Sequence, residues 1–403
     1  MEKAKKMNYI GELNPFNNMD KVKAFAKKNT MFIALLIVAL FFQVKTGGTL
    51  LAPRNMTNLV AQNGYVVILA VGMLMCILTG GNIDLSVGSI VALVGALAGT
   101  LIVTKGMNIY LSILICLSVG ILIGIWQGFW IAYVRIPAFI VTLSGMLLWR
   151  GIALIILGGL TISPFPDNYL NLFNSYIPDP FGRELNMMCM LIGIAVCVIF
   201  TATQLVNRGN KIKKGYITES LGVLAVKVVL ICTVILFAAY KLANHKGVPA
   251  ILILLAIVVS IYSYYTSKTV NGRYLYAVGG NEKAAKLSGI DTNKVLFKAY
   301  VNMAFLSAVA ALVCVARFNS AAPTAGTSYE MDAIAACFIG GASAYGGTGT
   351  VGGAVIGAIL MGVLNNGMSI MGIDANMQKA VKGLVLLAAV AFDVISKKRN
   401  KSK

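Results

Sequence analysis

The stretch NGRYLYAVGGNEKAAKLSGIDTNKVLFK, residues 271–298, is a long interior segment of mixed charge between two apolar runs. Its pattern is that of a folded, water-facing piece. Residues 281–287 predict about two helical turns, capped by Asn281 and ended by Gly289. That helix has a small apolar face, formed by Ala284, Ala285 and Leu287. We interpret the stretch as a docking surface for a cytoplasmic partner; an ordinary solvated connector is the alternative.

The rest of the chain is strongly apolar. Of its 403 residues, 58% are hydrophobic and 12% are charged, and the mean hydropathy is +0.81. Apolar runs of about 20 residues recur, which is the length a helix needs to cross ~30 Å of bilayer hydrocarbon. The period-two alternation of a membrane strand is absent. The sequence therefore predicts an all-α, polytopic membrane protein.

Basic residues gather between the apolar runs. The net charge of +20 invites a nucleic-acid interpretation, but the lysines and arginines cluster in residues 3–28, 208–214, 268–298 and 397–403. This distribution is typical of cytoplasmic segments beside an anionic leaflet. We expect a basic cytoplasmic leader at 1–29, a basic cytoplasmic tail at 397–403, and no nucleic-acid partner.

Residues 30–396 are expected to form a single transmembrane domain. The predicted spans are 30–46, two within 57–104, 109–133, 138–158, 187–207, 221–242, 249–265, 297–317, a short run at 331–344, 350–370 and 377–395. Both termini are basic, so both are expected inside and the number of crossings is expected to be even; counting the short run as a crossing gives twelve. Crossing and re-entry are both open for that run.

Two glycine-rich segments look alike. The first is LTGGNIDLSVGSIVALVGALAG at 78–99, and the second is FIGGASAYGGTGTVGGAVIGAIL at 338–360. Each has a Gly-Gly break, a polar loop and then a helix of small residues. Paired breaks of this kind are typical of transporters built from two related halves. The alternative is that the glycines only allow close helix packing.

The sequence offers little catalytic chemistry. Its one histidine, His245, lies in a predicted outer loop, and no cluster has metal-ligand spacing. A P-loop requires a Gly-Lys dipeptide, which does not occur. We expect no catalytic residue, no metal site and no cofactor in this chain, so the protein is not expected to be an enzyme.

Polar residues near the glycine breaks are candidates for a solute path. Asp84 and Lys227 are the charges expected inside the membrane, and Asp84 is predicted to cap the helix that follows Leu85. Neutral polar groups could exchange weak hydrogen bonds with a hydroxyl-rich solute, while hydrogen bonding between helices is the alternative. The path candidates are Asn82, Asp84, Ser86, Gln127, Thr142, Ser144, Asn365 and Asn366.

Several long motifs resemble one known family. They are TGGNIDLSVGSI at 79–90, IPAFIVTLSGM at 136–146, GRYLYAVGGNEKAAKLSGI at 272–290, SAAPTAGTSYEMDAIAACFIGGAS at 320–343 and the run from Gly346 to Gly372. The chain resembles the permease subunits of bacterial ABC importers for monosaccharides, a group that includes the ribose, galactose and xylose permeases. The resemblance extends from about residue 30 to residue 396.

The resemblance implies an architecture and a coupling element. It implies a ten-helix permease core, to which 187–243 adds an inserted helix pair, and a cytoplasmic coupling loop at 267–296. Gln127 stands where the family has Asn. The implied ATPase-coupling residues are Gly279, Gly280, Asn281, Glu282, Ala285, Leu287 and Gly289.

The resemblance also implies a division of labour. A homodimer of this chain in the bacterial inner membrane would import a pentose or hexose by alternating access. An extracytoplasmic sugar-binding protein would deliver the solute, and a cytoplasmic ATPase with two tandem cassettes would bind ATP and Mg. A stand-alone secondary carrier, a channel and a membrane-embedded enzyme are the alternatives. A carrier predicts ionisable groups along a path, and an enzyme predicts a clustered acid, base or metal site.

Overall fold

A computed structural model describes residues 30–182, 184–216 and 221–401. Within those ranges the regular elements are helices. Two isolated β-bridges link residues that lie between helices. The predicted all-α class is therefore confirmed. The helices are α3 (Thr30–Lys45), α4 (Pro53–Leu78), α5 (Val87–Gly99, extended by a π-helical turn to Thr104), α6 (Ile109–Ala132), α7 (Ala138–Leu157), α8 (Asp167–Asn174), α9 (Met187–Lys213), α10 (Leu221–Ala243), α11 (Ala250–Lys268), α12 (Val270–Gly280), α13 (Glu282–Leu287), α14 (Thr292–Phe318), α15 (Tyr329–Ile339), α16 (Val351–Ile370) and α17 (Ala375–Lys401).

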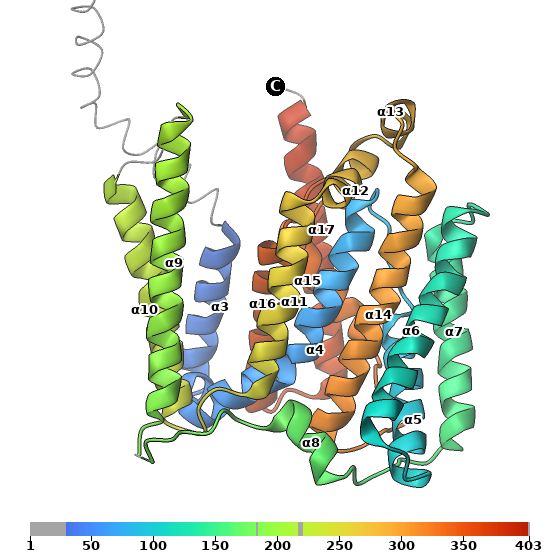
Figure 1. The fold of residues 1–403 in the computed structure, drawn as a ribbon, viewed down its shortest axis with the longest axis horizontal. Helices are drawn as coiled ribbons and strands as arrows, with labels where there is room; N and C mark the ends of the chain where they lie inside the picture. Colours follow the sequence, from blue (N-terminus) through green and yellow to red (C-terminus); the bar gives the residue numbers. More distant parts are fainter. Residues whose placement is uncertain (1–29, 183, 217–220, 402–403) are drawn as a thin grey trace, which may run out of the picture.

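The long helices stand side by side along one axis (Figure 1). The helices α12 and α13 lie at one end, called here the α13 end, and α8 lies at the opposite end. In the described part of the chain, nine helices are long and apolar enough to span a membrane. The first helix, α3, begins at the α13 end, where α17 also finishes. Residues 1–29, predicted as the leader, lie outside the described residues.

The short run at 331–344 forms α15, an 11-residue helix. Eleven residues rise only about 16 Å, roughly half the hydrocarbon thickness. The preceding helix, α14, ends at the α8 end, whereas α16 begins at the α13 end. The chain between them therefore crosses the bundle, with non-helical backbone at 319–328 covering the remaining depth. Twelve segments of the described chain run between the two ends.

The centre of the bundle is built from α4, α5 and α14, which are largely buried. Small residues let these helices approach closely. On α6, Gly120, Gly124 and Gly128 form a stripe facing α14. A Cβ atom at Gly120 would lie 2.5 Å from the Ala308 Cβ atom, and one at Gly124 would lie 2.6 Å from the Val301 Cα atom. The repeated glycine spacing therefore fixes the α6–α14 contact.

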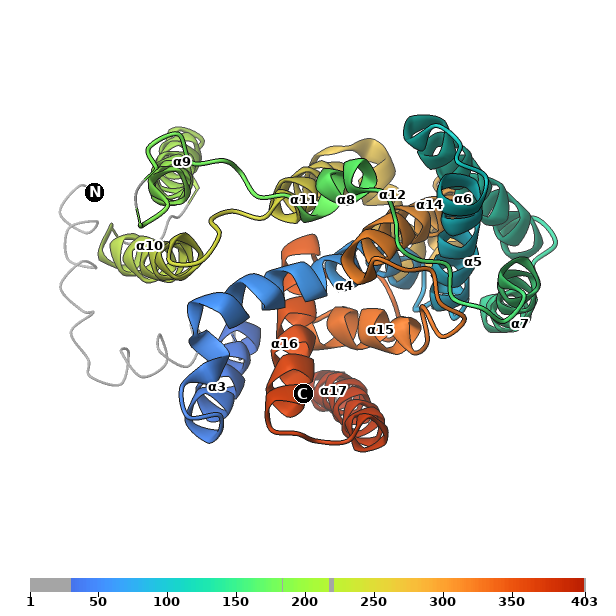
Figure 2. The same ribbon diagram turned by 90° about the horizontal axis from the view of Figure 1, so that it is seen from below.

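The predicted helix pair at 187–243 is α9 and α10, which lie at the edge of the bundle (Figure 2). They pack mainly on each other, with α10 also contacting α4. The span predicted at 187–207 is too short, because α9 continues through Lys213 and takes in most of the basic cluster at 208–214. Basic side chains stabilise the C-terminal end of a helix, so the charge run prolongs α9 instead of ending it.

The predicted outer loop at 159–186 contains a helix that the sequence analysis missed. In α8, Tyr169 is fully buried, and its hydroxyl donates a hydrogen bond to the Leu312 carbonyl oxygen at 2.8 Å. The neighbouring Asn174 amide donates to the Ala316 carbonyl oxygen. These contacts pin α8 across the end of α14. At the other end of the chain, α17 continues to Lys401, so the residues predicted as a basic tail begin inside a helix.

The α15–α16 contact depends on glycine. A Cβ atom added at Gly357 would lie 1.9 Å from the Ala336 carbonyl oxygen, whereas one at Gly352, on the same helix, would meet nothing within 4 Å. We expect Gly357→Ala to destabilise the protein by about 1–3 kcal/mol through overpacking. The matched Gly352→Ala variant should be neutral or slightly stabilising, because alanine favours helix. Thermal unfolding of the purified variants in detergent measures the difference, and equal midpoints would contradict this packing.

Candidate functional site: the coupling helices and the glycine breaks

The helix predicted at 281–287 is present as α13, and its role in coupling stays a prediction. The Asn281 side chain accepts a hydrogen bond from the Ala284 amide at 3.0 Å, which confirms the predicted N-cap. Gly289 has φ +82° and follows the helix as predicted. The predicted apolar face is wrong, because Ala285 packs inward at 5% exposure while Leu287 projects outward at 90% exposure. The six-residue helix α13 therefore exposes the side chain of Leu287.

The residues before α13 form a second helix, α12, in place of the predicted loop. Thr269 caps it by accepting the Gly272 amide hydrogen at 3.0 Å. Leu275 and Val278 are buried, and α12 contacts α4, α11 and α14. The apolar face of α12 therefore fastens the exposed α13 to the centre of the bundle.

At its end, α12 meets both glycine breaks in one backbone contact. The Gly347 amide donates a hydrogen bond to the Leu78 carbonyl oxygen at 3.1 Å. A Cβ atom at Gly279 would lie 1.8 Å from that same oxygen and 2.5 Å from the Gly347 nitrogen. Only a glycine fits there. The break after α4, the break after α15 and the end of α12 therefore form one junction, called here the glycine junction.

Side chains reinforce the glycine junction. The Tyr276 hydroxyl of α12 donates to the Gly349 carbonyl oxygen at 3.0 Å. On the other side, a carboxylate oxygen of Asp393 on α17 accepts the Ala344 amide hydrogen at 3.3 Å. The two segments that look alike in sequence thus lie against each other. Their relation as halves of an internal repeat stays a prediction.

The glycine junction makes a local prediction. In Gly279→Ala the new methyl group must push apart the Leu78 and Gly347 backbones, so we expect the Gly347 amide to lose protection from hydrogen exchange. Gly280→Ala is the matched control, because a Cβ atom there meets nothing within 4 Å. Hydrogen exchange of peptides covering 340–350, measured by mass spectrometry, should rise about tenfold in Gly279→Ala and stay unchanged in Gly280→Ala. Overpacking of this kind destabilises a contact by about 1–3 kcal/mol. Equal exchange in the two variants would refute the contact.

A second tie joins α13 to the turn between α6 and α7. A guanidinium nitrogen of Arg135 lies 2.6 Å from a Glu282 carboxylate oxygen, and the other terminal nitrogen donates to the Thr292 hydroxyl at 3.0 Å and to Asn293. Arg135 has φ +66°, a left-handed backbone that costs a non-glycine residue of order 1 kcal/mol. The three hydrogen bonds offset that cost. We call Arg135 and these three partners the arginine clamp.

The arginine clamp also sets the charge of Glu282. Partial burial opposes ionisation of this carboxyl group, but hydrogen bonds from Arg135 and Thr292 and the charges of Arg135 and Lys286 outweigh it, so the pKa is lowered. A lowered pKa means that the clamp stabilises the fold above the ordinary glutamate pKa. That contribution is lost as the pH falls through the lowered value.

Removing the arginine clamp should loosen α13. We expect Arg135→Ala to speed hydrogen exchange of residues 281–290 about fivefold, because an exposed ion pair contributes up to about 1 kcal/mol. Arg273→Ala, which removes an exposed arginine of α12, is the matched control and should leave this exchange unchanged. A wild-type rate in Arg135→Ala would show that α13 is held by its backbone alone.

Three of the path candidates form one buried chain. The Ser86 hydroxyl donates to a carboxylate oxygen of Asp84 at 2.6 Å, and the Gln127 amide donates to the Ser86 oxygen at 2.7 Å. All three side chains are fully buried. The predicted helix cap is wrong: the Asp84 carboxylate accepts the Ser86 amide hydrogen at 2.8 Å, and Ser86 itself is the N-cap residue. The carboxylate therefore shapes a turn before α5.

The remaining path candidates are dispersed. Asn82 donates to Thr79 within its own turn, and the Thr142 hydroxyl donates to Ala138 within α7. Ser144 is exposed on α7. Near the α8 end, Asn366 on α16 exchanges hydrogen bonds with Asn55 on α4, and Asn365 lies beside Asp332. The structure brings together Asp84, Ser86 and Gln127, and the role of all eight residues in a path stays a prediction.

More charged residues lie inside the bundle than the sequence predicted. Lys382 of α17 lies 2.9 Å from a carboxylate oxygen of Asp332 on α15, and the two side chains are 18% and 3% exposed. Arg150 of α7 donates to the Pro323 carbonyl oxygen at 3.3 Å, in the non-helical segment before α15. The predicted Lys227 is only partly buried on α10. A lone aspartate in the apolar run 331–344 was the available signal for this ion pair.

No metal-binding cluster of three or more His, Cys, Asp or Glu side chains occurs among the residues that the structure describes. The described geometry is that of an exposed helix, α13, held at two places and joined to the glycine breaks between the spans. Neither tie involves a group activated for covalent chemistry.

The chain matches a known permease family over most of its length. The family described as "Branched-chain amino acid transport system / permease component" matches residues 55–171 and 178–390. The chain belongs to this family. The resemblance inferred from the motifs is thereby confirmed, and the chain is a multi-pass membrane permease.

Its relatives include sugar permeases. The xylose transport system permease protein of Haemophilus influenzae is 38% identical over 369 residues, which cover 92% of this chain and 96% of the relative. The xylose transport system permease protein of Escherichia coli K12 is 37% identical and covered to 92% in both chains. The ribose import permease protein of the same strain is 34% identical, covering 92% of this chain and 95% of the relative. Among solved structures, no significant match is found.

Proposed function

We propose that this chain is the permease subunit of an ATP-driven importer that moves a monosaccharide, a pentose or hexose, into the cytoplasm by alternating access. The observation that carries the proposal is the exposed α13, which projects Leu287 away from the bundle and is tied to the helices that would have to move. The likeness to xylose and ribose permeases over more than nine-tenths of the chain supports the choice of solute.

A separate ATPase is the proposed partner of α13. The chain has no P-loop, so ATP and Mg would be bound by a cytoplasmic subunit with two tandem cassettes. The exposed Leu287, with Lys283 and Lys286 near it, suits a groove on the ATPase that is apolar at its centre and polar at its rim. Because α13 is short and rigidly joined to α12, a displacement of its tip would reach the bundle without being absorbed by a flexible linker.

The orientation follows from charge. Basic side chains of α9, α11, α12 and α13 gather at the α13 end, whereas Asp167, Asp179 and Glu184 lie toward the α8 end. By the positive-inside rule, we propose that the α13 end, with the start of α3 and the end of α17, faces the cytoplasm from a bacterial inner membrane. The proposal includes a second copy of this chain that completes the path, and an extracytoplasmic sugar-binding protein that docks at the α8 end.

The glycine junction and the arginine clamp offer two routes by which the proposed motion of α13 would reach the bundle. Movement of α13 would act through the glycine junction on the breaks after α4 and α15. Through the arginine clamp it would act on the α6–α7 hairpin. Gln127 of α6 is bonded to Ser86, so the hairpin also reaches the first break. Both routes therefore converge on residues 79–86, where the enclosed Asp84 lies.

A stand-alone carrier or channel is the alternative, and the buried Asp332–Lys382 pair is the observation that favours a carrier. The test is uptake of labelled xylose, ribose and other monosaccharides into proteoliposomes that contain this chain, its ATPase and its binding protein. Transport that requires ATP and both partners supports the proposal. Uptake by this chain alone would overturn it.

The docking role of α13 has its own test. We expect Leu287→Asp to weaken ATPase binding roughly thirtyfold, because a charge at the centre of an apolar contact costs 2 kcal/mol or more. Leu160→Asp is the matched control: the same change at a 73% exposed leucine at the opposite end should leave ATPase binding unchanged. Binding measured by co-purification and by titration in detergent distinguishes the two. ATPase binding that survives Leu287→Asp would place the docking surface elsewhere.

A further inference from the structure

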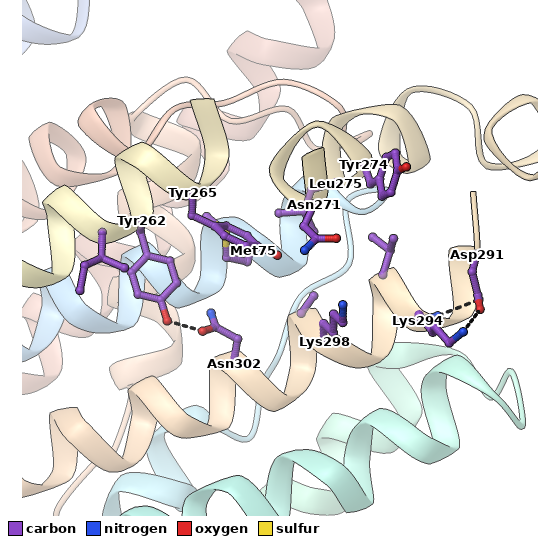
Figure 3. Close-up of a pocket in the computed structure, with 13 residues that line it drawn as sticks. Met75, Tyr262, Tyr265, Asn271, Tyr274, Leu275, Asp291, Lys294, Lys298 and Asn302 are labelled. Carbon is purple, nitrogen blue, oxygen red and sulfur yellow. Dashed lines mark hydrogen bonds and ion pairs between the residues drawn. The ribbon is translucent and has the colours of Figure 1, made fainter. Parts of the chain in front are cut away.

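A cavity of about 370 Å³ opens between α11, α12 and α14, beneath the coupling helices (Figure 3). Three tyrosines form its aromatic wall, namely Tyr262 and Tyr265 from α11 and Tyr274 from α12. The Tyr262 hydroxyl donates a hydrogen bond to Asn302 on α14, which fixes one side of the cavity. The cavity shares no lining residue with the glycine junction or the arginine clamp.

The length of α14 allows the cavity to lie at the depth of lipid headgroups. The helix α14 has 27 residues and is therefore about 40 Å long, some 10 Å more than the hydrocarbon layer. Lys298 is six residues from its start, about 9 Å along the axis. Tyrosines gather at this level in membrane proteins because the ring packs on acyl chains while the hydroxyl reaches water. Ile257 and Ile261 of α11 are exposed beside the cavity, which marks its apolar flank.

The charge in the cavity wall is positive. Asp291 and Lys294 line the outer rim and neutralise each other across 3.1 Å. Lys298 lies further in, is exposed, and has no carboxylate within ion-pair distance among the described residues. The wall thus offers the ammonium group of Lys298, which is free of any ion pair that the described residues show.

An apolar hollow continues from the cavity. Lys298 and Asn302 also line a neighbouring depression of about 270 Å³ between α14 and α6, together with Phe297, Val301 and Phe305. Lys298, Val301, Asn302 and Phe305 follow one another at helical spacing along one face of α14. This face changes from cationic to apolar with increasing depth, as a lipid changes from headgroup to acyl chain.

We propose that this cavity binds one anionic phospholipid of the adjacent leaflet. Lys298 binds the phosphate, and the tyrosine wall surrounds the glycerol region. One acyl chain lies along Val301 and Phe305. Basic pockets between membrane helices suit anionic headgroups on the cytoplasmic side. A soluble anion would use the lysines but would leave the apolar hollow uncovered. The proposal requires only membrane insertion, and it stands whether or not the chain imports sugar.

The test uses the full chain, delipidated in detergent and titrated with phosphatidylglycerol or phosphatidylcholine. Native mass spectrometry counts the bound lipids. We expect one phosphatidylglycerol to be retained in preference to phosphatidylcholine, and Lys298→Gln to weaken its binding about fivefold. Lys298→Arg should restore binding. Lys268→Gln is the matched control, since it removes an exposed lysine from the last turn of α11, outside the cavity.

Three outcomes would overturn the site. The first is unchanged phosphatidylglycerol binding in Lys298→Gln. The second is an equal loss in Lys268→Gln, which would show general surface attraction. The third is displacement of the lipid by millimolar glycerol phosphate, which would make a soluble anion the ligand. Thermal unfolding of each variant separates loss of the site from loss of the fold.

Discussion

The fold depends on one backbone contact in which three segments meet without side chains between them. The Leu78 carbonyl oxygen accepts the Gly347 amide hydrogen, and Gly279 closes over both atoms. Non-helical backbone inside a membrane protein leaves polar groups that lipid cannot satisfy, so each break needs a protein partner. Here each break supplies the partner of the other. The helix α12 can rest on them only because it ends in glycine.

The arginine clamp is a different kind of tie. A backbone junction is short-ranged and nearly insensitive to salt, whereas the Arg135–Glu282 pair is about 40% exposed and is screened by salt. Its strength lies in geometry, because one guanidinium fork engages the α13 side and the start of α14 together. The glycine junction thus holds the end of α12, and the clamp ties α13 to the turn between α6 and α7.

The spans could be predicted from the sequence, because a run of about 20 apolar residues is a local signal. Residues such as Pro249, Asn108 and Gly158 mark where the helices begin or end. Sequence reasoning recovered the cap at Asn281 for the same reason. It missed α8 and α12, whose apolar faces are only a few residues long. It also missed the Arg135–Glu282 and Asp332–Lys382 pairs, since 147 and 50 positions separate their members. Such partnerships follow from the packing of whole helices.

The missed charges change how the bundle is understood. A buried ion pair contributes little net stability, because desolvation of both groups offsets their attraction, yet removing one partner leaves a costly lone charge. Asp332 and Lys382 join α15, a helix of only 11 residues, to α17. The pair therefore acts chiefly on position: it keeps α15 at one depth, so that its break reaches Leu78 at the glycine junction.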